Sequence, residues 1–332
     1  MPKTMPNSNE IPLPLLITGC AGVPGYNAFR YFWERYPKKV IGIRGTLTWK
    51  LQHENIYAVD IEVESALKEL FARYRFRSIL EGSGSCALKI CELNPEHAYR
   101  INILGLQSLL RARQEYAPES RLIRLSSDLV FSGNRGGNYR ESDPPDPVTV
   151  YGKTMMESEQ LLMQQVPQAL ILRISLPMGE SFNGHAGAID WIENRFKKGR
   201  PATLYFDEIR TPTYTRDMEP VYEKLLSSSL SGIYHFGGQT RLSLYQIAQI
   251  INKIGGYAPY LLKGCLRYEA GPIPPRAGNV TMNSEKFYEA FEGCPFRPWP
   301  EEQLFFPTHL EWHQERQDFS NGGSKEIRAR LY

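Results

Sequence analysis

A glycine-rich loop close to the N-terminus restricts the fold of this chain more than any other feature. The short apolar run at residues 15–17 is predicted to be a β-strand, and it continues directly into Thr18-Gly19-Cys20-Ala21-Gly22-Val23-Pro24-Gly25. A helical pattern with aromatic side chains on one face follows. Strand, loop and helix in this order, with glycines spaced G-x-x-G-x-x-G, form a variant of the dinucleotide-binding fingerprint. Gly19 then permits the tight turn, Gly22 lets the backbone approach a pyrophosphate, and Gly25 allows the helix to pack closely on the strand.

The end of the second expected strand indicates which dinucleotide the chain prefers. Enzymes that bind NAD usually place Asp or Glu there to bind the ribose 2′-hydroxyl, whereas an arginine accommodates the 2′-phosphate of NADP. Here Arg44 ends the strand, and the first acidic residue after it is Glu54. We therefore expect NADP(H) in preference to NAD(H). Asp60 and Ile61, which follow the third strand, are expected to meet the adenine ring.

Short apolar runs alternate with helical patterns through the first half of the chain, as a parallel sheet built from βαβ units requires. We expect strands at residues 15–17, 40–43, 57–59, 78–80, 122–125 and 169–174, and helices at 63–74, from 94 to about 113, and from 151 to about 165. Further helices are expected at 186–198 and 243–255. The fold class is therefore α/β: a doubly wound parallel sheet (Rossmann) over residues 12–176, interleaved with a smaller C-terminal substrate-binding lobe over 177–312. The polar ends, 1–10 and 315–332, are expected to be mobile.

The composition excludes several other classes of protein. The 332 residues include 39 basic and 36 acidic side chains, and this net charge of +3 is not clustered, so a nucleic-acid partner is not expected. The uncharged stretch from Ile11 to Phe29 contains too many prolines and glycines for a membrane span. We expect no secretory signal, because the first ten residues carry no basic segment that leads into an apolar one. The five cysteines match no zinc-binding spacing and suggest free thiols in a reducing compartment, so we expect a cytoplasmic protein.

Two further motifs make the chain recognisable. Leu125-Ser126-Ser127-Asp128-Leu129-Val130-Phe131 and Val150-Tyr151-Gly152-Lys153-Thr154, together with the glycine loop, resemble the extended short-chain dehydrogenase/reductase superfamily. Within it, the chain is most similar to the dTDP-4-dehydrorhamnose reductase branch. The likeness extends over about residues 13 to 300 and includes the segments 94–102, 171–173, 211–217 and 232–235.

The resemblance implies a reaction and a role for named residues. A nucleotide-linked 4-keto deoxysugar would be reduced by NADPH, with Tyr151 protonating the developing alkoxide and Ser127 hydrogen-bonding the same oxygen. It also implies a homodimer. The residues expected to contact the cofactor are Thr18, Gly19, Gly22, Val23, Gly25, Arg44, Asp60, Ile61, Gly82, Ser83, Gly84 and Tyr151. Those expected to contact the nucleotide sugar are Ser127, Asp128, Arg173, Arg210, Tyr214 and Arg216.

One member of the family's Tyr-x-x-x-Lys motif is missing, because Met155 occupies the lysine position. Lys153 is no obvious substitute, since two residues along a helix correspond to about 200° around it. Without the lysine, Tyr151 has an ordinary pKa of about 10 and serves poorly as a base, but it still carries a proton as an acid. A weakened or altered reductase is therefore the leading hypothesis. The alternative is a non-catalytic subunit that binds NADP or a nucleotide sugar and regulates a partner, as the β-subunit of methionine adenosyltransferase does in this superfamily.

Glu81 is a second departure, since the family tends to have asparagine there, followed by small residues. The acid either lies beside the expected path of the cofactor or points into a polar network, and the sequence leaves both open. Cys86 and Cys91 are expected to be buried thiols near the cofactor pocket. His309 and His313 are four residues apart in an expected helical stretch, and their apolar neighbours favour packing over metal binding, so no metal site is expected.

Overall fold

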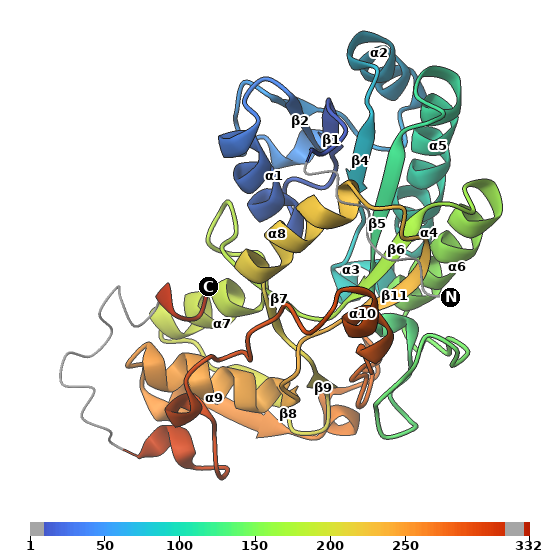
Figure 1. The fold of residues 1–332 in the computed structure, drawn as a ribbon. Helices are drawn as coiled ribbons and strands as arrows, with labels where there is room; N and C mark the ends of the chain where they lie inside the picture. Colours follow the sequence, from blue (N-terminus) through green and yellow to red (C-terminus); the bar gives the residue numbers. More distant parts are fainter. Residues whose placement is uncertain (1–9, 316–328) are drawn as a thin grey trace.

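A parallel β-sheet occupies the centre of the computed structural model, which describes residues 10–315 and 329–332 (Figure 1). Within those residues, seven strands are ordered β11-β6-β5-β4-β1-β2-β3, and every neighbouring pair is parallel. This doubly wound order confirms the expected fold class. The strands are β1 (Leu15–Ile17), β2 (Val40–Arg44), β3 (Ile56–Ala58), β4 (Ser78–Glu81), β5 (Arg121–Ser127), β6 (Leu170–Ile174) and β11 (Gly232–Phe236).

Helices cover both faces of the sheet (Figure 1). They are α1 (Val23–Arg35), α2 (Glu64–Tyr74), α3 (Leu88–Leu93), α4 (Pro95–Tyr99), α5 (Gly105–Tyr116), α6 (Val150–Gln165) and α8 (Thr215–Leu226). Side chains of α1 and α8 pack in one apolar core, and those of α2, α5 and α6 pack in another. The strands alternate between the two, with Leu15 and Ile17 in the first core and Leu16 in the second. Because both faces of the central strands are buried, β1, β2, β4 and β6 are largely apolar runs, which is why the sequence predicts them. Strand β11 was not expected from the sequence.

The second half of the chain builds a smaller lobe around its own apolar core, which includes residues from α7, α9, β8 and β13. Its elements are β7 (Pro177–Met178), α7 (Ala188–Lys197), β8 (Ala202–Tyr205), β9 (Ile209–Arg210), β10 (Thr213–Tyr214), β12 (Leu242–Ser243), α9 (Leu244–Ile254) and β13 (Leu262–Cys265). Helix α10 (Glu285–Ala290) instead packs against β11 in the core of the main sheet. Its strands pair as β10 with β7, β12 with β9, and β13 with β8. Strand β11 and helix α8 return to the main sheet, so the two parts are interleaved along the chain.

The helix expected from residue 94 to about 113 is interrupted. The side chain of Asn94 caps α4 by accepting from the His97 amide at 3.0 Å, as expected. A π-helical turn, Arg100–Leu104, then separates α4 from α5. At its centre, the Asn102 side chain donates to Thr154 Oγ1 at 2.8 Å and accepts from the Ser85 amide at 2.7 Å. Such turns occur mostly at functional sites, and periodicity alone does not show them.

Short 3₁₀ turns connect several elements: η1 (Thr46–Thr48), η3 (Asp128–Val130), η4 (Pro259–Leu261), η5 (Arg267–Ala270), η6 (Gln303–Phe305) and η7 (Trp312–Gln314). His309 and His313 therefore do not lie on one regular helix, contrary to the sequence expectation. The cap of α9 is as expected, because Ser243 and Gln246 form a reciprocal capping box. Among the residues that the structure describes, no helix combines the length and apolar character needed to cross a membrane.

The extreme C-terminus is packed rather than loose. Leu331 is fully buried, and its carbonyl accepts from Trp299 Nε1 at 3.0 Å. The Tyr332 hydroxyl donates to Asp190 at 2.8 Å. Mobility is expected for 315–332; among the described residues 329–332, Leu331 is held in the apolar core of the lobe, whereas Ala329 and Arg330 are exposed. Residues 1–9 and 316–328, which fall under the same expectation, lie outside the described residues.

Candidate active site

Close packing fixes two of the three glycines in the loop between β1 and α1. Gly19 has φ +68°, and a Cβ there would lie 2.2 Å from the carbonyl oxygen of Gly82. A Cβ at Gly25 would lie 2.3 Å from the carbonyl oxygen of Gly19. At Gly22 the nearest atom is 3.4 Å from such a Cβ, so no close packing forbids a side chain there. Gly22 therefore leaves room at the helix start without being required by the fold.

The start of α1 is a suitable anion site. Gly22 is the N-cap and offers no side-chain oxygen, so none caps the first amide groups of the helix. The helix dipole also favours negative charge at this end. Val23 is buried here at the first helical position. Thr18 faces elsewhere: its hydroxyl accepts from the amides of Gly82 and Ser83 at 2.9 and 3.1 Å, so its side chain joins two loops inside the protein.

The expected adenosine contacts lie where β2 and β3 end. Arg44 donates to the carbonyl oxygens of Leu51 at 2.6 Å and Gly45 at 3.0 Å. The Asp60 carboxylate accepts from the amide and hydroxyl of Thr46 at 2.8 and 2.7 Å. An acid therefore does lie beside the end of β2 in space, although it comes from the loop that follows β3. The preference for NADP(H) loses the support of a missing acid and depends on Arg44 alone.

Ile61, the other expected adenine contact, is 6% exposed and packs in the core beneath α5. A Cβ at Gly105 would lie 2.5 Å from Ile61 Cγ2, which shows how closely the two are packed. The side chain is therefore held by the core. Only its backbone remains for the adenine contact that the sequence predicts.

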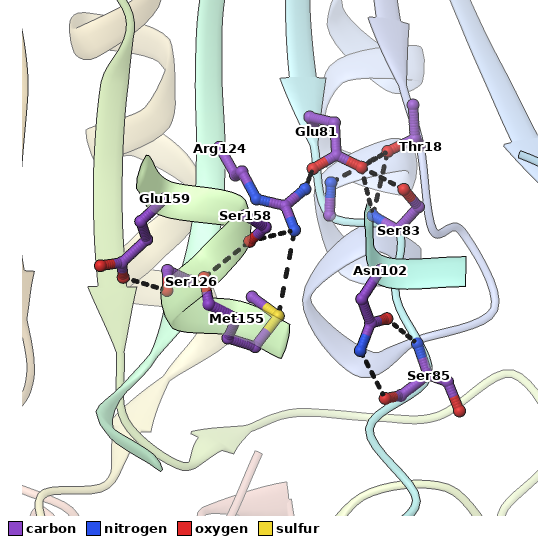
Figure 2. Close-up of polar contacts among 11 residues, drawn as sticks. Thr18, Glu81, Ser83, Ser85, Asn102, Arg124, Ser126, Met155, Ser158 and Glu159 are labelled. Carbon is purple, nitrogen blue, oxygen red and sulfur yellow. Dashed lines mark hydrogen bonds and ion pairs between the residues drawn. The ribbon is translucent and has the colours of Figure 1, made fainter. Parts of the chain in front are cut away.

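The loop after β4, residues 82–85, is held by a polar network (Figure 2). Glu81 is fully buried and accepts from Thr18 Oγ1 at 3.2 Å, from the Ser83 amide at 3.0 Å and from the Ser83 hydroxyl. Its other oxygen pairs with Arg124. Of the two alternatives that the sequence left open, the structure supports the polar network. Gly82, Ser83 and Gly84 stay at the carboxyl edge of the sheet, where open α/β sheets bind their ligands.

Ser127 and Tyr151 meet at the same edge. Ser127 is the last residue of β5, and Tyr151 is the second residue of α6, whose cap Thr149 accepts from the Gly152 amide at 2.9 Å. A Cβ at Gly152 would lie 2.1 Å from the carbonyl oxygen of Leu129, so the glycine lets α6 start directly against the turn that follows Ser127. The Ser127 hydroxyl lies beside the phenol and lowers its pKa; it donates to Asp128 at 3.3 Å and accepts from the Leu129 amide at 3.1 Å. The structure therefore brings together the two residues expected to carry the reaction.

The surroundings of Tyr151 keep its phenol protonated. Burial raises the pKa of Tyr151 above its ordinary value, and the neighbouring Cys86 thiol and the Asp128 carboxylate act in the same direction. The neighbouring Ser127 hydroxyl and the positive charge of Arg124 lower this pKa but do not cancel the effect of burial. A phenol in this state can donate a proton at neutral pH. It is a poor proton acceptor.

Two carboxylates beside this pair bind arginines inside the protein. Asp128, with no exposed surface, accepts from Arg210 through two hydrogen bonds of 2.6 Å. Glu159 holds Arg173 at 2.7 Å, and Arg173 also lies 3.3 Å from His235. Asp128, Arg173 and Arg210 were expected to contact the nucleotide sugar. These buried contacts favour a positioning role for them over direct contact.

Tyr214 and Arg216 are not brought to Ser127. Tyr214 is 2% exposed, and its hydroxyl donates to the Arg330 carbonyl at 2.8 Å, within the core of the C-terminal lobe. Arg216 lines a separate cavity of about 160 Å³ between α1 and α8. Both positions follow from the start of α8, which points these side chains toward α1 and the C-terminus. Their expected contact with the sugar finds no support in this geometry.

Met155 replaces the lysine in an apolar setting. It is 3% exposed and packs with residues of η3 and with Met282. Lys153 is exposed on the outer side of α6, as its angular position predicts, so it does not substitute. The nearest cation recorded beside Met155 is Arg124, whose Nη2 lies 3.9 Å from Met155 Sδ (Figure 2). Neither Arg124 nor Asn102 was singled out from the sequence, because an isolated Arg in a strand and an Asn in a helix carry no motif of their own.

The cysteines and histidines form no reactive cluster in the described part of the chain. All five cysteines are free, as expected, and Cys91 is buried. Cys86 is exposed, so its expected burial is wrong, because it lies on the loop before α3. Within residues 10–315 and 329–332, no group of three potential metal ligands is found. His313 packs against Tyr245 with ring centroids 6.1 Å apart.

Comparison with known families and proteins places this geometry in context. The family described as RmlD substrate binding domain matches residues 14–304. The chain is 28% identical over 290 residues to dTDP-4-dehydrorhamnose reductase of Aggregatibacter actinomycetemcomitans, a match that covers 83% of this chain and 92% of the relative. It is also 28% identical over 308 residues to methionine adenosyltransferase 2 subunit beta of Xenopus laevis, with 90% of each chain covered.

Solved structures share the fold. The UDP-glucose 4-epimerase of Thermus thermophilus, in complex with NAD, superposes with a TM-score of 0.73 at 20% identity, covering 91% of this chain and 99% of that one. The dTDP-4-dehydrorhamnose reductase of Bacillus anthracis, in complex with NADP, gives 0.69 at 21% identity, covering 86% and 95%. Relatives of this fold thus bind either nicotinamide dinucleotide.

Proposed function

Because the chain belongs to the RmlD substrate binding domain family, we propose that it uses NADPH to reduce a 4-keto deoxysugar linked to a nucleotide. The observation that carries this proposal is the placement of Ser127, at the end of β5, beside Tyr151, at the start of α6. In this proposal residues 12–176 bind the cofactor, and residues 177–312 form the substrate lobe. Relatives named dTDP-4-dehydrorhamnose reductase support the same reaction.

The residues present fit a nicotinamide dinucleotide. The uncapped start of α1 at Gly22 and Val23 suits its pyrophosphate, and Gly19 and Gly25 keep that turn tight. Residues 82–84 would line the path toward Tyr151, while Arg44 would meet the 2′-phosphate. When bound, the reduced cofactor supplies the hydride for the carbonyl carbon.

The protein supplies the proton and the polar contacts. Tyr151 holds a proton on its phenol oxygen and delivers it to the oxygen of the substrate carbonyl. Ser127 donates a hydrogen bond to the same oxygen as negative charge develops there. Because burial raises the pKa of Tyr151, the phenol keeps its proton at neutral pH. It can therefore donate in the direction of reduction, as a weaker acid than an unperturbed tyrosine, and works poorly as a base in the reverse direction. Asp128 and Arg210, which are bound to each other, hold the neighbouring wall of the site.

The decisive experiment mixes the purified protein with NADPH and a panel of nucleotide-linked 4-keto sugars. Loss of the reduced-nicotinamide absorbance that depends on both the sugar and Tyr151 supports the proposal. NADH in place of NADPH tests the cofactor preference, and an Arg44→Ala variant should lose affinity for NADPH while keeping its affinity for NADH. No sugar-dependent oxidation with any member of the panel contradicts the proposed reduction.

A non-catalytic role has its own support. Met155 removes the cation that the family's tyrosine uses, and some relatives are named methionine adenosyltransferase 2 subunit beta. In that alternative, the chain binds NADP or a nucleotide sugar and regulates a partner. Thermal stabilisation by the dinucleotide without turnover, together with a partner that copurifies in stoichiometric amount, would favour it over the reductase.

A further inference from the structure

The missing lysine raises the question of which positive charge serves Tyr151. In short-chain reductases with the complete motif, as the resemblance implies, the cation would come from the helix position that Met155 occupies here. A buried cation nevertheless lies beside that position. Arg124, on β5, is 1% exposed, and its Nη2 lies 3.9 Å from Met155 Sδ (Figure 2). Its charge acts on the phenol of Tyr151, whose pKa it lowers.

Strand register places Arg124 and its partner together. In the parallel pair of β4 and β5, Glu81 is directly opposite Arg124. Their side chains form an ion pair, and Glu81 has no exposed surface. Arg124 Nη2 also donates to Ser158 Oγ at 3.0 Å, one turn beyond Met155 on α6. The guanidinium is therefore held between the sheet and α6.

The ion pair has a fixed direction. Glu81 accepts on its other side from Thr18 and Ser83, so its negative charge lies toward the two cofactor loops. The guanidinium extends to α6, so the positive charge lies toward Met155 (Figure 2). A dipole with this orientation presents its cation to the helix that carries Tyr151. Glu81 and Arg124 are charged residues inside an otherwise apolar sheet, and each compensates the charge of the other.

We propose that Arg124 is a positioning residue that supplies, from strand β5, the positive charge that the family's lysine supplies from helix α6. Glu81 holds it in place, and Met155 is the uncharged residue that this arrangement requires. The inference rests on the proposed reduction for its catalytic meaning. The position of the positive charge can also be tested by measurements of stability, which need no turnover. Restoring the lysine at position 155 would place a second cation against a buried one.

The first experiment measures stability. Met155→Lys is compared with Met155→Gln, a neutral side chain of similar length, in the natural protein and in a Glu81→Gln/Arg124→Met background. We expect Met155→Lys to lower Tm by on the order of 5 °C more than Met155→Gln does in the natural protein, because two cations then share one buried site. In the neutral background this excess should become smaller, because the repulsion from Arg124 is gone and only the cost of burying the lysine remains.

The pH dependence of Tm separates the effect of the lysine charge from the effect of a changed side-chain shape at position 155. A lysine beside Arg124 has its pKa lowered in the folded state, so the unfolded chain binds more protons and the variant gains stability as pH rises. The Tm deficit of Met155→Lys should therefore shrink between about pH 6 and about pH 9, while that of Met155→Gln stays constant. A deficit that is equal for both variants, or independent of position 124, overturns the proposal.

The second experiment measures turnover with NADPH and the best keto sugar. Glu81→Gln/Arg124→Met should lower kcat by about tenfold or more, and adding Met155→Lys should recover part of the loss. Because Glu81 also holds the loop 82–85, the dissociation constant of NADPH is measured for each variant and kcat is compared at saturation. Arg124→Lys, which keeps the charge, should retain more activity than Arg124→Met. Unchanged kcat without Arg124, or a gain in kcat from Met155→Lys alone, overturns the inference. A natural protein without turnover contradicts the proposed reduction, and the stability experiment then still decides where the charge lies.

Discussion

Arg210 binds Asp128 through two parallel hydrogen bonds of 2.6 Å, from Nε to Oδ2 and from Nη2 to Oδ1. Asp128 follows Ser127 at the end of β5, whereas Arg210 lies on β9 in the C-terminal lobe. The pair therefore joins the lobe to the strand end that carries the reacting serine. Ser175 adds a third hydrogen bond to Asp128 at 2.6 Å.

Arg210→Met should strongly destabilise the protein, because it leaves the Asp128 charge buried without its partner. We expect the free energy of unfolding in urea to fall by about 3–5 kcal/mol. Adding Asp128→Asn should recover much of that loss, since both charges are then gone. Arg30→Met is the matched control: its pair with Glu180 is about half exposed on both sides, and the expected change is within about 1 kcal/mol. Equal losses for the two arginines would contradict the role of burial.

Tyr151→Phe removes the proton donor and leaves the ring in place. The rate of NADPH oxidation with the keto sugar should fall by about 10²–10⁴-fold, the usual contribution of a positioned proton donor. Binding of NADPH, measured by its fluorescence, should change little. Tyr99→Phe, at an exposed position on α4, serves as the control and should keep the full rate. A Tyr151→Phe variant with undiminished turnover would remove this residue from the mechanism.

The glycines of the first loop should respond differently to alanine. Gly25→Ala forces a Cβ to within 2.3 Å of the Gly19 carbonyl oxygen, so it should destabilise the fold. Gly22→Ala meets nothing closer than 3.4 Å, so the variant should fold with nearly the natural Tm. Its new methyl group lies where the pyrophosphate is expected, so affinity for NADP(H) should fall at least about tenfold. Dinucleotide titration and thermal melts of both variants check this, and normal NADP(H) binding by Gly22→Ala would argue against the assigned cradle.

Two buried groups should give stability opposite dependences on pH. Burial, aided by the charge of Arg173, lowers the pKa of His235 to about 3, so the unfolded chain binds the extra proton first as pH falls. Stability is therefore lost below about pH 6.5, the pKa of an unperturbed histidine, by up to about 1.4 kcal/mol per pH unit. Burial raises the pKa of Glu219 to about 7, so its contribution falls as pH rises from about 4.5 toward 7.

Urea unfolding of His235→Gln and Glu219→Gln at several pH values separates these effects. Relative to the natural protein, His235→Gln should gain stability as pH falls, and Glu219→Gln should gain stability as pH rises. Parallel pH profiles for all three proteins would show that neither group titrates as its surroundings suggest.

Most of the sheet was predictable, because strands buried on both faces show as apolar runs and the glycine loop fixes where the first one ends. The interruption around Asn102 was not, since its cause is a pair of contacts with Ser85 and Thr154 that are distant in sequence. Ser127 and Tyr151 were found from their motifs, and the structure brings them together. The roles of the expected sugar-binding residues were less accessible, because a sequence does not show that Arg210 and Arg173 already have buried carboxylate partners.

The role of Glu81 was also not predictable from the sequence. In the sequence Glu81 is an unexplained acid near the cofactor path, and no motif marks Arg124. Only the register of β4 against β5 places them opposite each other and explains both. Asp60, in the loop after β3, likewise places an acid beside the end of β2. Charge compensation between strands depends on how the strands are paired in the folded sheet, so it cannot be predicted from a local stretch of sequence.

Strand β11 pairs with β6 at the edge of the sheet, and this pairing determines how truncated fragments of the chain should behave. A fragment ending at residue 176 would lack that strand and leave the backbone of β6 open to pair with other chains. Such a piece should aggregate instead of serving as an isolated nucleotide-binding module. Limited digestion in the second half should accordingly produce nicked protein whose pieces remain associated until denaturant is added.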